Sequence, residues 1–249
     1  MHYYYPFSMY RLLKHGIGSS NSVWPSILGA FTGALAAFIF GLAMFYFTKK
    51  RERFVIHRNA LIKLDRLLNE HADELLIAKL NADTTKKIIE KDAVTDYRFK
   101  ILKLDDSILT DLASTDVLNE YNFYARSISR LNQDFEAKNR VLTRFEDAKL
   151  ADRKLAQESI DYLASSLGEI SGAIEERIDT LMLHLLAKVR IYVRKIDECN
   201  PIIYGVFQGN RNFTITDEEI RAEIATLNGE VETLREETGE KFKKFGTSS

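Results

Sequence analysis

An uncharged apolar run of 25 residues, Val23–Phe47, limits what this chain can fold into more than any other feature of the sequence. About 20 apolar residues are enough for a helix to cross the hydrocarbon core of a bilayer. Trp24 and Tyr46, near the two ends of the run, are aromatic residues of the kind found at membrane interfaces. A cleaved signal peptide would have a shorter apolar core followed by a small-residue cleavage motif, and no such motif follows this run. We therefore predict a transmembrane helix over residues 23–48.

Basic residues are concentrated on the C-terminal side of this run. Residues 49–66 contain seven basic and two acidic side chains, a local net charge of +5, whereas only two basic residues precede the run. The positive-inside rule then predicts a short non-cytoplasmic tail over residues 1–22 and a cytoplasmic C-terminal part, most simply at a bacterial inner membrane. The basic residues nearest the run are also candidates for contact with the membrane surface: Lys49, Lys50, Arg51 and Arg53.

Small residues recur at every fourth position within the run. They are Gly29, Gly33, Ala37 and Gly41, so that one face of the predicted helix carries only small side chains. Such a face allows the backbones of two membrane helices to approach closely. We therefore expect the chain to form a homo-oligomer in the lipid bilayer. No ionisable residue interrupts the run, which argues against a transporter or a proton path.

The composition of the chain indicates a packed, helical soluble part. Hydrophobic residues make up 45% and charged residues 29%, which is ordinary for a globular protein. Only three prolines occur, and about 175 residues between Pro25 and Pro201 contain none, which favours long helices. The single cysteine, Cys199, excludes an intramolecular disulfide and fits a reducing compartment. The net charge of −1 gives no general attraction to nucleic acid, and we expect none as a partner.

Apolar residues at helical spacing predict an all-α fold. A juxtamembrane helical stalk is expected over residues 49–80, although a first helix folded back on the others fits the same pattern. A cytoplasmic antiparallel helical bundle with long, coiled-coil-like helices is expected over residues 81–200. Its longest helix follows a stripe of apolar residues that includes Ile170, Ile174, Ile178, Leu181, Leu185 and Val189.

The C-terminal part of the chain contains two candidate interaction elements. Residues 201–215 form an apolar loop or hairpin, with four candidate partner-binding residues: Ile202, Ile203, Tyr204 and Phe207. Residues 216–249 form a helix and tail that begin with a capping-box pattern at Thr216 and Glu219. Its apolar residues step by fours and threes as a coiled-coil seam: Ile220, Ile224, Leu227, Val231 and Leu234. This seam fits either docking on the bundle or pairing with another chain.

Residues that carry chemistry are few. The sequence has no GxxxxGK[ST], GxGxxG or GxSxG motif, and no two of its five histidines have a metal-ligand spacing on one helix face, so we expect no cofactor and no metal. Six residues separate Arg177 from His184, and four separate Arg66 from His71. This spacing resembles that of the HEPN family of small helical ribonucleases, in which an Arg is followed four to six residues later by a His.

The HEPN resemblance implies RNA cleavage across a dimer, with histidine as a general acid or base at the ribose 2′-hydroxyl. The polar residue that usually follows the Arg in that family is replaced here by Ile178 and Leu67. Both histidines also fit as ordinary residues of a helix face.

Three hypotheses of function follow. The first is a non-enzymatic single-pass membrane protein whose cytoplasmic helical domain self-associates and binds a protein partner, as a scaffold, sensor or accessory factor. The second is an oligomeric pore-forming or membrane-disrupting effector, for example in bacterial defence. The third is a membrane-anchored HEPN-like ribonuclease.

Overall fold

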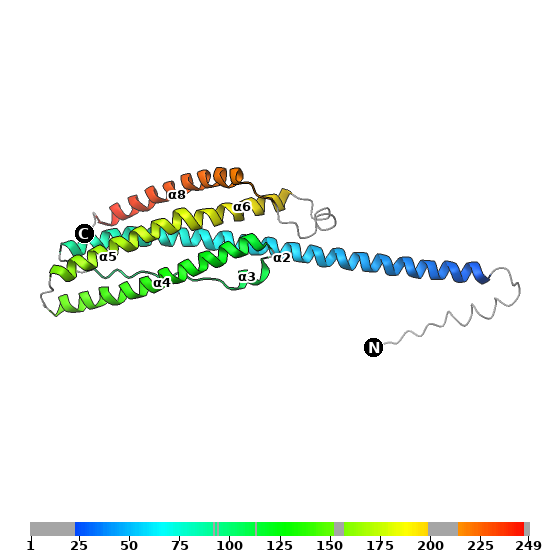
Figure 1. Ribbon diagram of the computed structural model, residues 1–249, viewed down its shortest axis with the longest axis horizontal. Coiled ribbons are helices and arrows are strands. Elements are labelled where there is room, and N and C mark those ends of the chain that lie inside the picture. The colour runs from blue at the N-terminus through cyan, green and yellow to red at the C-terminus, as the bar shows by residue number, and fades with distance from the viewer. Residues whose placement is uncertain are drawn as a thin grey trace. The chain divides into compact units, whose positions relative to one another are not determined.

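The computed structural model describes residues 23–91, 93, 95–112, 114–151, 157–198 and 214–246, and all regular structure within them is helical (Figure 1). The predicted all-α class is therefore confirmed for this part of the chain. The elements are α2 (Val23–Glu90), α3 (Ser107–Asp111), α4 (Thr115–Leu150), α5 (Gln157–Glu176), the π-helical turn η1 (Arg177–Met182), α6 (Leu183–Glu198) and α8 (Asp217–Gly246). The chain divides into two compact units, Met1–Glu52 and Arg53–Ser249, and the boundary between them falls within α2.

The first unit contains the apolar part of α2. None of the most apolar 18-residue window of this helix is buried, and the helix is long and apolar enough to cross a membrane. The hydroxyls of Thr32 and Thr48 donate to the carbonyls of Leu28 and Met44, at 2.7 and 2.9 Å. These two hydroxyls are thereby satisfied within the helix.

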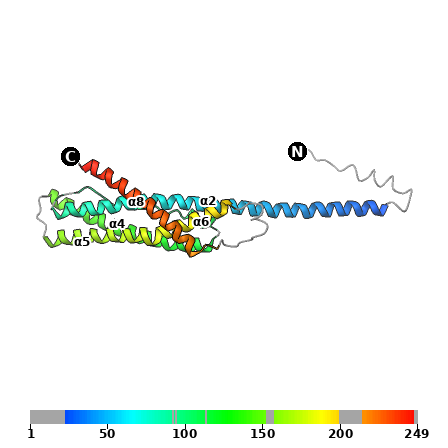
Figure 2. The same ribbon diagram turned by 90° about the horizontal axis from the view of Figure 1, so that it is seen from above.

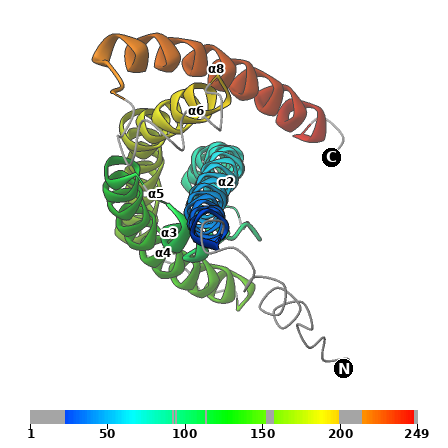
Figure 3. The same ribbon diagram turned by 90° about the vertical axis from the view of Figure 1, so that its right-hand side faces the viewer.

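The second unit, called the helical unit below, is built on the rest of α2. Six apolar side chains of α2 are completely buried there: Leu61, Leu64, Leu68, Leu75, Ala82 and Ile89. Seen end-on, α4, α5, α6 and α8 form an arc around α2 (Figure 3). The sequence predicts a stalk that ends at residue 80, whereas α2 continues to Glu90, and its residues from Ala60 onward belong to the core.

An extended segment, residues 95–105, lies between α2 and α4 and is paired to side chains of both. Asn139 accepts from the N–H of Phe99 at 2.7 Å and donates to its carbonyl at 2.9 Å, and Asn132 does the same for Leu102 at 2.9 and 2.8 Å. Seven helical residues rise about 10.5 Å and three extended residues cover about 10 Å, so the two asparagines match the spacing of the two backbone sites. The segment therefore pairs with α4 much as it would with a neighbouring strand.

This segment sets the directions of the helices. It runs antiparallel to α4, as the Phe99–Asn139 and Leu102–Asn132 pairs show, and antiparallel to α2, where Lys100 pairs with Glu74 and the Lys103 carbonyl with His71. Consequently α2 and α4 run in the same direction, whereas α5 and α6 run opposite to α4, and α8 opposite to α6 (Figures 1 and 2). The antiparallel bundle is predicted over residues 81–200, so this parallel pair involves the helix that the sequence assigns mainly to a stalk.

The helix over residues 157–198 contains a wide turn. In η1 the N–H of Leu183 donates to the carbonyl of Ile178, five residues earlier. Apolar residues recur at every fourth position from Ile170 to Leu186, and in a regular α-helix each such step would drift by about 40° around the axis. A π-helical turn takes up this drift. As a result Met182 is completely buried, whereas Leu181, which belongs to the predicted stripe, is only half-buried.

We expect Asn139→Ala to destabilise the chain by about 1–3 kcal/mol, because the backbone N–H and carbonyl of the buried Phe99 would lose their partners. The free energy of unfolding can be measured by urea titration of the full chain in detergent, followed by circular dichroism. Gln133→Ala, at an exposed position of the same helix, is the matched control. Equal stability of the two variants would contradict this role of Asn139.

Candidate functional site

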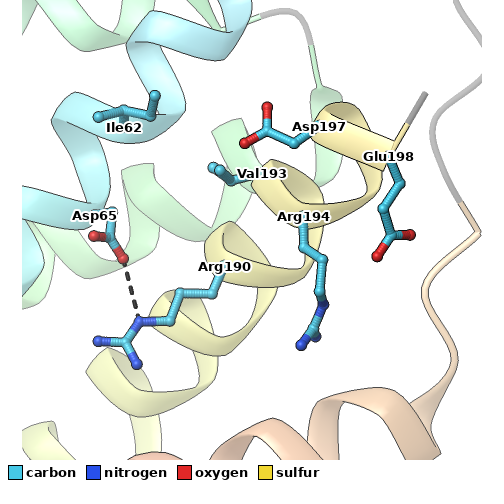
Figure 4. Close-up of a pocket in the computed structure, with 7 residues that line it drawn as sticks. All are labelled: Ile62, Asp65, Arg190, Val193, Arg194, Asp197 and Glu198. Atoms are coloured by element: carbon cyan, nitrogen blue, oxygen red, sulfur yellow. Dashed lines mark hydrogen bonds and ion pairs between the residues drawn. The ribbon is translucent and has the colours of Figure 1, made fainter. Parts of the chain in front are cut away.

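A crevice of about 640 Å³ between α2 and α6 is lined by charged residues. Ile62 and Asp65 come from α2 and the remaining side chains from successive turns of α6 (Figure 4). Those from α6 are Arg190, Val193, Arg194, Asp197 and Glu198. The crevice thus places two guanidinium groups and three carboxylates around a small apolar floor.

Arg190 connects three helices at this crevice. Its Nε donates to Asp65 Oδ1 at 3.4 Å, a pair drawn in Figure 4, and its Nη2 donates to Asn69 Oδ1 at 3.4 Å, both on α2. Its Nη1 donates to both carboxylate oxygens of Glu230 on α8, at 2.9 and 3.1 Å. Only about a quarter of the side chain is exposed, so these pairs are less screened than pairs on an open surface.

Two further cations of α6 bind α8. Arg194 donates to Glu223 at 3.0 Å, and Lys195 donates to Glu219 at 2.8 and 2.9 Å and to the carbonyl of Thr214 at 2.8 Å. Hydrogen bonds from Lys195 and from the Thr216 N–H lower the pKa of Glu219 to about 2. The Glu219 N–H in turn donates to the Thr216 hydroxyl at 3.2 Å, so the predicted capping box is present.

A bidentate pair joins α2 to Asp197, one of the residues that line the crevice. Arg58 Nε and Nη2 donate to the two oxygens of Asp197 at 2.5 and 3.0 Å. These hydrogen bonds lower the pKa of Asp197 and raise that of Arg58. With Arg58, Arg190, Arg194 and Lys195 each matched to a carboxylate, the cations hold α6 to α2 and α8 rather than offering positive charge to an external anion.

The predicted coiled-coil seam lies on the inner side of α8. Ile220, Leu227 and Val231 are buried, and Ile224 and Leu234 pack partly buried against the same core. Helix α8 packs mainly on α6. Of the two arrangements that fit the sequence, the structure shows docking on the chain's own helices.

His71 is a core residue whose two ring nitrogens are both occupied. Its Nε2 lies 2.8 Å from the carbonyl of Lys103, which must accept, so its Nδ1 accepts from the Tyr124 hydroxyl at 2.7 Å. Burial lowers the pKa of His71 and raises that of Tyr124, which favours the neutral form of both. His71 therefore holds α2, α4 and the extended segment together, and Arg66 lies exposed one turn and a half away.

Arg177 and His184 stand on either side of η1 and make separate contacts. Arg177 donates to the carbonyl of Ala173 at 2.8 Å, whereas His184 Nδ1 lies 3.5 Å from Glu120 Oε2, beside the Lys188–Glu120 ion pair. In a regular α-helix, residues seven apart share a face. The extra residue of the π-helical turn rotates His184 by about 100° around the helix axis relative to Arg177, so the two side chains point in different directions. Within the described part of the chain, no hydrogen bond or ion pair joins them.

The remaining predicted sites lie in the first unit, at its boundary with the second at Arg53, or in undescribed segments. A Cβ added at Gly29, Gly33 or Gly41 would meet no atom within 4 Å. Lys49 and Lys50 lie over the rings of Phe45 and Tyr46, at 5.7 and 4.7 Å from the ring centroids, and Arg51 and Arg53 are exposed. The candidate partner-binding residues lie outside the described residues: Ile202, Ile203, Tyr204 and Phe207.

Sequence reasoning found the apolar seam of α8 but missed the ion pairs beside it. Arg190 and Asp65 are 125 residues apart in the chain, and no local pattern predicts such a pair. One signal was present: the basic residues Arg190 and Arg194 lie one turn apart on α6, and acidic residues recur at Glu223 and Glu230 on α8. Two adjoining helices with opposite charges beside their apolar stripes are expected to pair.

We expect Arg190→Met to loosen α8, because this change removes the hydrogen bonds from Arg190 to Asp65 and Asn69 on α2 and to Glu230 on α8. Half-exposed ion pairs contribute up to about 1 kcal/mol, so backbone amides of α8 near Glu230 should exchange about two- to fivefold faster with deuterium. Hydrogen exchange of the full chain in detergent, read by mass spectrometry, measures this. Arg221→Met, on the exposed side of α8, is the control, and equal exchange in the two variants would refute the role given to Arg190.

Comparison with known proteins identifies no relative of this chain. No family model matches it, no curated protein is similar to it, and no solved structure matches it. Its function therefore has to be argued from its own residues and their geometry.

Proposed function

We propose that this chain is a single-pass membrane protein whose helical unit lies in the cytoplasm, self-associates and binds a protein partner, as a scaffold, sensor or accessory factor. The observation that carries the proposal is the exposure of the apolar run in α2. Most large side chains along it are more than half exposed, among them Trp24, Phe31, Phe40 and Phe45 at 65–72%. A core helix of a soluble protein would be buried by its neighbours, so a bilayer is the environment that suits this surface.

The charged end of the run supports this membrane position. Lys49 and Lys50 direct their amino groups over the rings of Phe45 and Tyr46, four residues earlier. Lysines and aromatic residues together at the end of a span are typical of a membrane interface. The excess of basic residues after the run is the basis for placing the helical unit on the cytoplasmic side.

The small-residue face of the span is the basis for self-association. The positions of Gly29, Gly33 and Gly41 are open in the chain itself, so a second helix would meet no side chain there. Close backbone packing and the absence of bulky side chains favour helix pairing in a membrane. The small residues thus suit a contact between copies of the span.

The orientation can be tested with the chain's own acceptor motif, Asn212-Phe213-Thr214. When the chain is synthesised with microsomes we expect no glycan at Asn212, because the helical unit would stay on the cytoplasmic side. As a control, Phe7→Asn with Met9→Thr creates an acceptor in the N-terminal tail, which should gain one glycan. A glycan at Asn212, read as a shift on a gel that a glycosidase removes, would reverse the proposed orientation.

The span contact can be tested by replacing Gly33 and Gly41 with leucine. We expect the wild-type chain in mild detergent to form a defined oligomer and the double variant to have a lower mass by light scattering, because leucine fills the face on which the helices would meet. Thr32→Leu with Ala43→Leu adds similar bulk on another side of the helix and serves as the control. An unchanged mass in the glycine variant would show that this face does not carry the assembly.

A further inference from the structure

The outer face of α4 carries a row of arginines. Arg126, Arg130, Arg140 and Arg144 are all exposed and lie on the side of the helix opposite to its buried residues, such as Ile128 and Phe135. The exposed carboxylates of Asp134 and Glu136 lie between Arg130 and Arg140, so the basic character of this surface is strongest at its two ends. In the part of the chain that the structure describes, none of these four arginines forms an ion pair. Exposed apolar side chains flank the row, with Phe123 62% and Val141 37% exposed. We call this row the basic row.

The outer face of α5 carries the opposite charge. Helix α5 contains no lysine or arginine, and its exposed side presents Glu158, Glu169 and Glu176. No ion pair within the described residues involves these three glutamates. Tyr162, which is 70% exposed, lies on the same side. We call this set the acidic row.

The two rows lie on neighbouring, oppositely directed helices of one chain (Figure 1). Arg126 to Arg144 and Glu158 to Glu176 each span 18 residues, about 27 Å of helix. A hollow of about 340 Å³ opens between the helices and is lined by residues of both rows and by apolar residues, including Val141, Arg144, Glu158 and Tyr162. The surface therefore joins two equally long rows of opposite sign, with the hollow at the end where Arg144 and Glu158 lie.

We propose that this α4–α5 surface binds the same surface of a second copy of the chain, with the basic row of each copy against the acidic row of the other. A two-fold contact places one patch against itself, which requires a patch that is complementary to itself. A surface with a single sign of charge would repel its own copy, whereas two parallel rows of opposite sign satisfy the requirement. The hollow beside each Tyr162 is positioned to receive the Tyr162 ring of the other copy.

This inference names a contact for the self-association in the proposed function, and it does not depend on the glycine face of the span. Seven charged groups per copy are involved, and each exposed pair adds little. Their sum, with the apolar side chains beside them, accounts for a reversible contact that weakens as salt screens the charges.

The test exchanges the charges of the two rows in the full chain. One variant replaces the four arginines of the basic row with glutamate, and a second replaces Glu158, Glu169 and Glu176 with arginine. Each alone should be at least about tenfold weaker in self-association at low salt, because like charges then face each other. An equimolar mixture of the two should form mixed oligomers, and a chain carrying both sets of changes should associate as the wild type does. Mass photometry and native mass spectrometry in detergent measure these masses.

The control variant reverses four exposed basic residues that lie elsewhere and have no ion pair within the described residues: Arg66, Lys87, Lys103 and Arg221. It should keep the wild-type mass. The same variants are also made in a chain that carries Gly33→Leu and Gly41→Leu. The self-association through the α4–α5 surface is then measured without the contact between spans. Mixed oligomers in that background would support the α4–α5 contact even where the span contact fails. A monomeric wild type, an unchanged mass after either reversal, or a mixture that stays unmixed would overturn the proposal.

Discussion

The packing of the helical unit depends on hydrogen bonds between helix side chains and the backbone of one extended segment. Residues 95–105 run between two helices, where no strand is available to pair with their N–H and carbonyl groups. Asn132 and Asn139 on α4 and His71 on α2 supply those partners, and Phe99 stacks on Phe135 with ring centroids 4.8 Å apart. An unpaired backbone group at a buried site is costly. These side chains therefore hold Phe99 and Leu102 of the segment in the core, in the position where the segment connects two helices that run in the same direction.

The features that could be predicted from the sequence are those that depend only on the spacing of residues along a single helix. The apolar stripes predicted the existence of the helices, and Thr216 with Glu219 predicted the cap of α8. The reason is that residues three and four apart on a helix are neighbours whatever the rest of the chain does. The extension of α2 to Glu90 was missed because the residues after position 80 are polar and resemble a loop until the surrounding helices bury Ala82, Thr85 and Ile89.

The wide turn η1 and the asparagine pairs could not be predicted for a different reason. A π-helical turn shifts by one position which residue faces the core, so that Met182 is buried here instead of Leu181. This shift stabilises the fold only when neighbouring helices define where the core lies. Asn132 and Asn139 are seven residues apart on α4, which is a readable spacing. Their partners, however, lie 30 and 40 residues away. Spacing alone does not distinguish a structural pair of asparagines from two solvated ones.

Charge is distributed differently on the two sides of the helical unit. On the side of α8, Arg190, Arg194 and Lys195 of α6 each form an ion pair with a carboxylate of α8. The apolar seam of α8 is buried beside these pairs. On the outer side of α4 and α5, charges of both signs remain unmatched within the described residues, and large apolar side chains stay exposed beside them. Both sides use the same chemistry, which is a row of cations against a row of carboxylates next to apolar residues. Since the first arrangement joins two helices of one chain, the same complementarity on the open side is best suited to joining helices of two chains.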